Sequence, residues 1–133
     1  MKKDIDKVIP EVEHVDVVAA FEYNSNFKVE EWTIYLVNDT TEALETVLVV
    51  SKGESKTKTT SVLRKKLEVL PAKSFAKLEF LHEDLLQVDN IFQVTYFLDG
   101  KLMHKDFKFQ KNSLKSKDIK ALPLLTLKGI IAE

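Results

Sequence analysis

The sequence contains no cysteine, which excludes disulfides, thiolate zinc sites, iron–sulfur clusters and cysteine nucleophiles. Its three glycines, Gly53, Gly100 and Gly129, are isolated, so they cannot form a Gly-x-Gly-x-x-Gly or Walker-type phosphate loop. The Gly-x-Ser-x-Gly pattern of a nucleophile elbow is also missing. The residues therefore predict no catalytic site and no cofactor.

Long hydrophobic runs are equally scarce. Apolar runs such as residues 47–50 and 122–125 are far shorter than the roughly 20 residues of a membrane-spanning helix. Residues 1–7 alternate in charge and no apolar stretch follows them, so no secretory signal is expected. The sequence predicts a cytoplasmic protein with no membrane partner, and the lack of cysteine agrees with a compartment where disulfides do not form.

Length and composition predict a single domain. The chain has 133 residues, of which 44% are hydrophobic and 31% are charged, close to the average for globular proteins. A chain of this length buries enough apolar surface to fold without crosslinks. We therefore expect one domain over residues 1–133, made of a sandwich over residues 12–110 and a tail over residues 111–133.

Charge is divided between the two halves of the chain. Residues 1–50 hold 4 Lys against 11 Asp or Glu, whereas residues 51–133 hold 16 Lys or Arg against 10 Asp or Glu. Arg64 is the only arginine, and nucleic-acid readers favour arginine for its planar fork. The lysines thus indicate solvated surface, and nucleic acid is not the expected partner. The local exception to this interpretation is a lysine-rich strip, whose positive charge would attract phosphate. It contains Lys101, Lys105, Lys108, Lys111, Lys115, Lys117 and Lys120.

Alternating and β-branched runs predict about seven strands. The clearest pair flanks Asp99 and Gly100, a dipeptide typical of a type I′ hairpin turn because both central residues need positive φ. The unbroken run Val47–Val50 indicates a strand covered on both faces. For residues 59–70 a helix is the competing prediction. The expected strands are residues 14–23, 31–38, 44–51, 59–70, 76–80, 91–98 and 101–109.

Short strands with polar connections and no long amphipathic helix are typical of an all-β, antiparallel two-sheet sandwich. A small β-barrel is the alternative. Three segments resemble the B, C and E strands of immunoglobulin-like and fibronectin-type sandwiches, which implies an immunoglobulin-like fold with Trp32 in the core. They are Trp32-x-Ile34-x-Leu36-x-Asn38, Val47-x-Val49-x-Ser51 and Ala76-x-Leu78-x-Phe80.

The tail has a different pattern from the strands. Ser116 is in position to cap a short helix through Ile119 that ends before Pro123, so we expect a partly helical tail. Its apolar side chains cannot remain in water, and they either pack across one end of the sandwich or dock on a neighbouring copy. These side chains are Leu124, Leu125, Leu127, Ile130 and Ile131.

Three histidines raise the question of a metal site. His104 and Asp106 lie two positions apart on an expected strand and so share a face, while His82 is followed by Glu83 and Asp84. Polar residues are normal on the solvated face of a hairpin, and metal sites without cysteine need three or more convergent ligands. The sequence therefore predicts no metal site.

The chain resembles a family of short, uncharacterised bacterial single-domain proteins, some of them labelled phenylalanyl-tRNA synthetase alpha subunit. Class II synthetases bind ATP through arginines of their second and third motifs, whereas here Arg64 is followed by lysines without either motif. No synthetase residue carries over, and we interpret the label as a transfer error. The resemblance rests on six segments of the sequence, residues 2–5, 9–12, 49–53, 73–77, 122–124 and 128–130.

We predict a non-catalytic protein–protein interaction module that uses a strand edge, a loop end or the apolar tail. The partner is an unknown protein, with a homodimer through the tail as one form. An RNA, tRNA or synthetase-associated accessory protein that uses the lysine-rich strip is the alternative, and an enzyme comes third. The predicted interaction residues are Lys105, Lys108, Lys111, Lys115, Leu124, Leu125, Leu127, Ile130 and Ile131.

Overall fold

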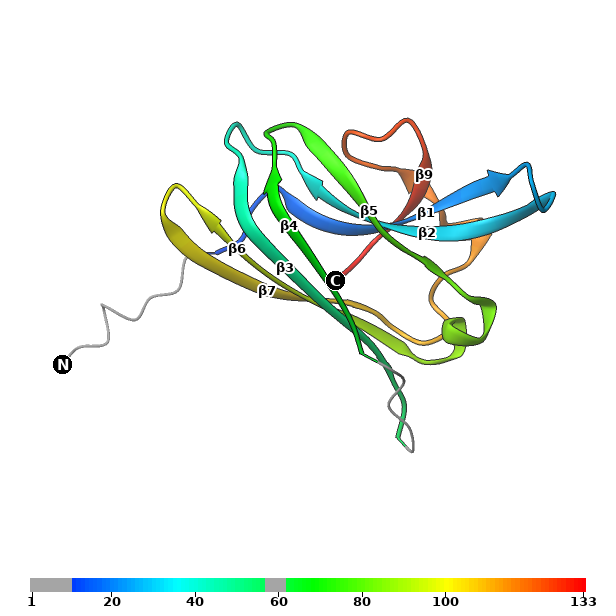
Figure 1. The fold of residues 1–133 in the computed structure, drawn as a ribbon. Helices are drawn as coiled ribbons and strands as arrows, with labels where there is room; N and C mark the ends of the chain where they lie inside the picture. The colour runs from blue at the N-terminus through cyan, green and yellow to red at the C-terminus, as the bar shows by residue number, and fades with distance from the viewer. Residues whose placement is uncertain (1–10, 57–61) are drawn as a thin grey trace.

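Two antiparallel sheets face each other in a computed structural model that describes residues 11–56 and 62–133 (Figure 1). The strands are β1 (Val15–Asn24), β2 (Val29–Asn38), β3 (Leu44–Glu54), β4 (Leu63–Leu70), β5 (Ser74–Leu81), β6 (Asp89–Leu98), β7 (Lys101–Phe109), β8 (Lys120–Ala121) and β9 (Lys128–Ile131). Two 3₁₀ turns, η2 (Glu83–Gln87) and η3 (Ser116–Asp118), complete the described elements.

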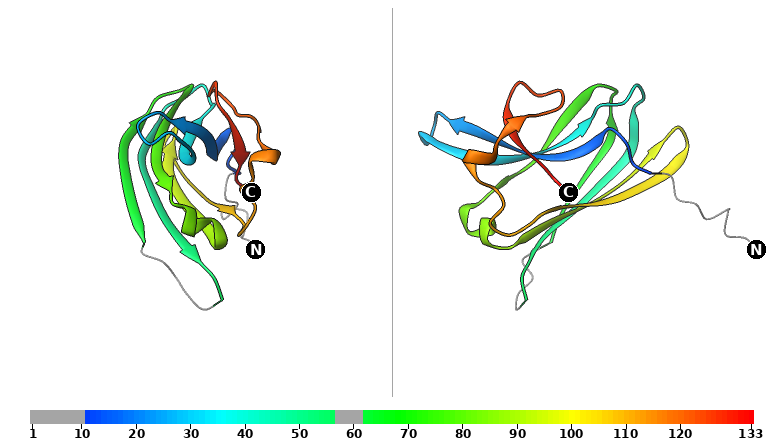
Figure 2. Two further views of the ribbon diagram at one scale, coloured as in Figure 1. Left: turned by 90° about the vertical axis from the view of Figure 1, so that its right-hand side faces the viewer. Right: turned by 180° about the vertical axis from the view of Figure 1, so that it is seen from behind.

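One sheet has five strands in the order β5-β2-β1-β9-β8, and the other has four in the order β4-β3-β6-β7. Viewed on edge, the two sheets form the layers of a sandwich (Figure 2). The all-β prediction is confirmed. Within the described residues, however, there are nine strands rather than about seven, because the tail supplies β8 and β9.

The hairpin prediction is also confirmed. Asp99 has φ 51° and Gly100 has φ 74°, the positive values that a type I′ turn needs. The strand expected over residues 59–70 is observed from Leu63 as β4 at the edge of its sheet, while residues 59–61 lie outside the described residues.

The main core fills the space between the sheets. Alternate residues of β1 and β2, such as Val17, Ile34 and Leu36, are fully buried there, and Trp32 packs beside Phe21 with ring centroids 4.7 Å apart. Four hairpin aromatics enter the same core from β6 and β7: Phe92, Tyr96, Phe107 and Phe109.

A second, smaller core lies on the outer face of the five-stranded sheet. The residues of β1 and β2 that point away from the main core, Val18, Ala20, Tyr35 and Val37, are buried beneath tail residues. The covering side chains are Leu122, Leu125 and the partly buried Leu127.

The structure of the tail differs from the one predicted. It is not partly helical: η3 is a single three-residue turn, and Ser116 lies inside it without making a capping hydrogen bond. The tail also covers a sheet face rather than one end of the sandwich. Its strand β9 joins the five-stranded sheet beside β1, because the backbone there finds ladder hydrogen bonds that a short helix would not offer.

The prediction that Val47–Val50 is covered on both faces is wrong. Val47 and Val49 are buried in the main core, but Leu48 is exposed on the outer face of β3. Thr46 has φ 49° and the register with β6 shifts there, so this bulge sets which residues of β3 face outward.

Candidate interaction surfaces

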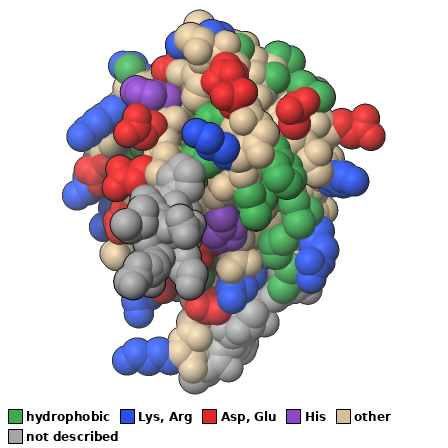
Figure 3. All heavy atoms as spheres, turned by 90° about the vertical axis from the view of Figure 1, so that its left-hand side faces the viewer, with side chains coloured by type: hydrophobic (Ala, Val, Ile, Leu, Met, Phe, Trp, Pro, Cys, Tyr) green, Lys and Arg blue, Asp and Glu red, His purple; other side chains and the backbone are tan. Residues whose placement is uncertain are grey.

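Four large apolar side chains lie uncovered on the outer face of the four-stranded sheet. Leu48, Val69, Phe97 and Leu102, from β3, β4, β6 and β7, are between 39% and 57% exposed. The register joins them across the sheet, since Phe97 pairs with Leu102, and Glu45 lies between Phe97 and Val69. We call these four residues the apolar patch. Hydrophobic side chains form a band bordered by charges on the face in Figure 3.

The two sheets differ in whether their outer faces are covered by other parts of the chain. The apolar outer residues of the five-stranded sheet are buried by the chain's own tail, whereas those of the four-stranded sheet have no cover among the described residues. Large apolar side chains exposed together on one face mark interaction sites, and Glu45 is the charged residue that lies between two of them here. The apolar patch is therefore the strongest candidate for protein contact.

Charges of opposite sign flank the apolar patch. Asp106 lies on β7 at one edge of the sheet, paired with Gln93 of β6. Lys66 and Arg64 lie on β4 at the other edge, paired with Leu48 and Val50 of β3. The outer face thus carries one carboxylate on β7, a strand that also holds Lys101, Lys105 and Lys108, and two cations on β4.

His104 holds a hydrogen-bonded position on the same face. Its Nε2 is 2.8 Å from Asp106 Oδ1, and its Nδ1 is 2.8 Å from Thr95 Oγ1. Both ring nitrogens therefore have protein partners. No group of three or more His, Asp or Glu arranged for a metal ion occurs within residues 11–56 and 62–133. His82 lies against Phe80 instead, with ring centroids 5.5 Å apart.

The lysine-rich strip is divided by the fold. Lys108 Nζ is 3.5 Å from Asp89 Oδ2, and the backbone N–H of Lys111 donates to Asp89 Oδ1 at 2.8 Å. This hydrogen bond, followed by the nearby lysine charges, lowers the pKa of the Asp89 carboxyl. Lys105 instead lies 4.9 Å above the ring of Phe107, and Lys115 immediately precedes η3. The lysines thus do not form one continuous row, and the RNA hypothesis stays a prediction.

Lys105 also faces a carboxylate of the neighbouring sheet. Burial raises the pKa of Asp16 on β1, while the charges of Lys105 and His14 oppose that shift. The strip therefore has acidic neighbours from two different strands, Asp16 and Asp89.

The predicted tail residues separate into buried and exposed groups. Leu125 is buried in the smaller core on the outer face of the five-stranded sheet, which we call the outer core. Leu127 and Ile130 are partly buried. Leu124 and Ile131 remain exposed, Leu124 with φ 63°. Of this group, Ile130 and Ile131 line a groove together.

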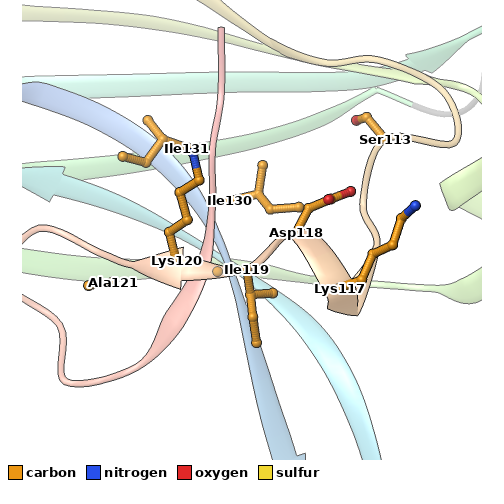
Figure 4. A pocket seen from close by; sticks show the side chains of 9 residues that line it. Ser113, Lys117, Asp118, Ile119, Lys120, Ala121, Ile130 and Ile131 are labelled. Atoms are coloured by element: carbon orange, nitrogen blue, oxygen red, sulfur yellow. The ribbon is translucent and has the colours of Figure 1, made fainter.

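This groove has a volume of about 600 Å³. It lies between β9 and the segment containing η3 and β8 (Figure 4). Its walls are formed by Ile119, Ile130 and Ile131 with Lys117, Lys120 and Asp118. We call it the β9 groove. A second cleft of about 380 Å³ lies at the end of the sandwich between Trp32, Phe80 and Glu83.

Sequence reasoning missed the apolar patch. Leu48 sits in an unbroken valine-rich run, and Phe97 and Leu102 flank the hairpin turn in positions that look like ordinary core residues. The available signal was the cross-strand pairing, which places Phe97 opposite Leu102 once the Asp99–Gly100 turn is fixed.

The helical segments of the described chain are short 3₁₀ turns, and none combines the length and the apolar character needed to cross a membrane. In comparisons with protein-family models, curated proteins and solved structures, nothing matches this chain.

Proposed function

We propose that the protein is a non-catalytic protein–protein interaction module and that the apolar patch is its docking surface. The contrast between the two outer sheet faces carries this proposal: the tail buries one, while the other keeps four large apolar side chains in solvent. Burying such side chains against a partner is favourable because it removes apolar area from water. The partner that fits this face is a second copy of the chain.

One pair of opposite charges supports a second copy: Asp106, Gln93, Val50 and Arg64 lie in one row across the sheet. A two-fold axis that runs parallel to the strands, between two facing four-stranded sheets, would exchange their edges, so β7 of one copy would lie over β4 of the other. Asp106 of each copy would then face the basic edge with Lys66 and Arg64. The same rotation brings the two apolar patches together at the centre of the contact.

The order of the strands supports a finer proposal about the fold. The first seven strands form β5-β2-β1 in one sheet and β4-β3-β6-β7 in the other. The orders β5-β2-β1 and β3-β6-β7 match strands E-B-A and C-F-G of immunoglobulin-like sandwiches, although β4 pairs with β3 rather than with β5. On this support we propose an immunoglobulin-like domain extended by β8 and β9. Such domains serve many unrelated functions, so the fold alone assigns no activity.

Analytical ultracentrifugation of the full chain tests the docking proposal. We expect a dimer within a range of about 1 to 200 µM, where a modest interface is populated. Leu102→Lys combined with Val69→Lys should weaken the dimer at least about thirty-fold, because four charges would be brought into one apolar contact. Both positions are exposed, so the melting temperature should stay within a few degrees.

Tyr23→Lys combined with Phe27→Lys is the matched control. These residues are 62% and 73% exposed but lie away from the apolar patch, so the dimer should be unchanged. Asp106→Lys should weaken the dimer, and adding Lys66→Asp should restore it. A wild-type chain that sediments as a monomer throughout, or a dimer indifferent to the patch substitutions, contradicts the proposal.

A further inference from the structure

We propose that the free edge of β7 is a second interaction site, which takes an extended segment of a partner protein as an added antiparallel strand. β7 is the outermost strand of the four-stranded sheet (Figure 1), so one of its two sides has no neighbouring strand among the described residues. The site uses backbone groups of β7, and it does not depend on the dimer proposed above. Three features of β7 support it: the direction of its backbone groups, the regularity of the strand and the charges beside its edge.

One contact shows which backbone groups of β7 point away from β6. Lys108 exchanges two backbone hydrogen bonds with Glu133, so its N–H and C=O face the free side of the strand. Alternate residues of an antiparallel strand direct these groups to the same side, and the register of β7 with β6 is unbroken over the whole strand. The N–H and C=O groups of Leu102, His104 and Asp106 therefore face the free side as well.

These three residues form an open edge rather than one free position. Within residues 11–56 and 62–133, no backbone hydrogen bond reaches their outward groups. The edge is also accessible, since Leu102 is 57% exposed and the side chains of His104 and Asp106 are 50% and 54% exposed. A row of unpaired backbone groups of this kind is a template for an added strand.

The contact with Glu133 also indicates the direction of an added strand. Both of its hydrogen bonds join the same two residues, Glu133 and Lys108, which is the pattern of an antiparallel pair. A partner segment that runs in the same direction would follow Glu133 along the edge, passing Asp106 first and Leu102 last. The tail thus occupies one end of the edge and leaves the rest open.

Two other long edge strands are protected against such pairing. β5 pairs with β2 through a register shift, and the Lys65 Nζ donates to its Lys77 carbonyl at 2.8 Å. β4 carries three consecutive cations, Arg64–Lys66. Bulges, occupied edge groups and rows of charge all oppose strand addition. β7 has an unbroken register, and its protecting group is Lys105.

Lys105 sets the chemistry of the segment that fits. It lies on the face of β7 that carries Met103 and Phe107, with its Nζ 4.9 Å from the centre of the Phe107 ring. Asp16 acts on it from the neighbouring sheet without coming within ion-pair distance. A lysine there disfavours an apolar partner strand, because the added strand would cover its charge. A carboxylate opposite Lys105 removes that penalty.

The other positions follow from the pairing rule. Directly opposed side chains of paired strands share a face and interact, and opposite charges there are favourable. Asp106 therefore favours a base opposite it, and Leu102 favours an apolar side chain. Along an antiparallel partner the preferred order is a base, an acid, two less restricted positions and an apolar residue.

Nuclear magnetic resonance of the ¹⁵N-labelled full chain tests this proposal. The probe is the capped pentapeptide Lys-Glu-Thr-Val-Leu, and its counterpart, Glu-Lys-Thr-Val-Leu, has the same composition and net charge. At about 5 mM, the first peptide should slow hydrogen exchange of the Leu102, His104 and Asp106 amides at least about threefold. The Met103 and Lys105 amides face β6 and should change little. The counterpart should bind at least about fivefold more weakly.

A third peptide tests the backbone contact itself. An N-methyl group on the threonine of the first peptide removes the N–H that would face His104, so this peptide should not bind. Binding that survives the methyl group would show that side chains alone hold the peptide, and it would contradict strand addition.

Lys105→Glu combined with Asp106→Lys should reverse the preference between the first two peptides. Lys28→Glu combined with Glu83→Lys exchanges the same charges at exposed positions outside β7 and should leave the preference unchanged. Val69→Lys, on β4, alters the dimer surface without touching β7 and should bind the first peptide normally, so failure of the dimer and failure of this edge are distinguishable. Absence of protection at the three outward amides, or an unchanged preference in the β7 double variant, would overturn the proposal.

Discussion

At the scale of single residues, two buried tyrosines differ in how their hydroxyls are satisfied. The Tyr35 hydroxyl donates a hydrogen bond to Glu22 Oε2 at 2.8 Å. The Tyr96 hydroxyl, buried in the main core, has no hydrogen-bond partner in the described residues. Burial raises the pKa of both phenols to about 12, and for Tyr35 the bond to Glu22 adds to that shift.

Replacing each tyrosine by phenylalanine should therefore change stability in opposite directions. Tyr96→Phe removes a buried polar group without a partner and should raise the free energy of unfolding by about 1 kcal/mol. Tyr35→Phe removes a hydrogen bond to a carboxylate and should lower it by about 1 kcal/mol. Urea unfolding followed by fluorescence measures both. A loss of stability in Tyr96→Phe would mean that its hydroxyl has a partner.

At the scale of elements, β9 depends on one glycine. A Cβ atom at Gly129 would overlap the carbonyl oxygen of Ala19 and lie 2.9 Å from the Ala20 Cα. These are backbone atoms of the adjacent strand β1, so they cannot swing aside as a side chain could. The close approach of β9 to β1 therefore requires the residue without a side chain.

Gly129→Ala should lower the free energy of unfolding by roughly 2 kcal/mol, because β9 must move away from β1. It should also speed proteolysis within the tail. Lys128→Ala, at an exposed position of the same strand, should change stability by less than about 0.5 kcal/mol and serves as the control. Equal stabilities for the two variants would show that β9 is free to shift.

The elements differ in how far sequence could predict them. The β6–β7 hairpin follows from local rules, because the Asp99–Gly100 turn and the flanking alternation lie in one short stretch. β8 and β9 have two and four residues, too short for any periodicity, and their pairing depends on a strand from the other end of the chain. The apolar pattern of the tail indicates that it is buried but not where.

At the scale of the whole molecule, the described chain joins its two sheets through the last residues of the tail. Ala132 donates to the Val17 carbonyl on β1, and Glu133 exchanges two backbone hydrogen bonds with Lys108 on β7, at 3.0 and 3.1 Å. One side of the sandwich is thereby bridged, so the tail both covers the outer face of one sheet and joins the two sheets.

A polar contact also joins the sheets inside the sandwich. Ser51 on β3 donates to Glu79 Oε1 on β5 at 3.4 Å. Burial raises the pKa of the Glu79 carboxyl above its usual 4.5, while Ser51 and the charge of His82 act in the opposite direction. Protonated Glu79 is therefore better accommodated in the folded state than ionised Glu79.

This shift predicts a pH-dependent effect of Glu79→Gln. Below about pH 4 the carboxyl is protonated in both states and the variant should match the wild type. As the pH rises through the folded pKa, the wild type loses the stability that the protonated carboxyl had provided, so at pH 7 the variant should melt at the higher temperature. Thermal unfolding from pH 3 to pH 8 measures this. A variant less stable at pH 7 would contradict the sign.

The candidate sites were less predictable than the sheets for a physical reason. The sequence of a run such as Val47–Val50 does not show whether the face of the strand that points away from the core is covered or exposed to solvent. In the same way, the lysine spacing carries no sign that Asp89, on β6, lies beside Lys108 and Lys111. The exposure of one face of β3 and the contact of the lysines with Asp89 both arise from pairing between distant segments.

The outer core of the five-stranded sheet has a consequence for how the chain is made on the ribosome. β1 and β2 emerge early, but Leu122 and Leu125, which shield their outer side chains, are synthesised much later. During that interval Val18, Val37 and their neighbours are open to water and to other nascent chains. A holding chaperone that binds this strip and releases it when the tail arrives would suppress misassembly during translation.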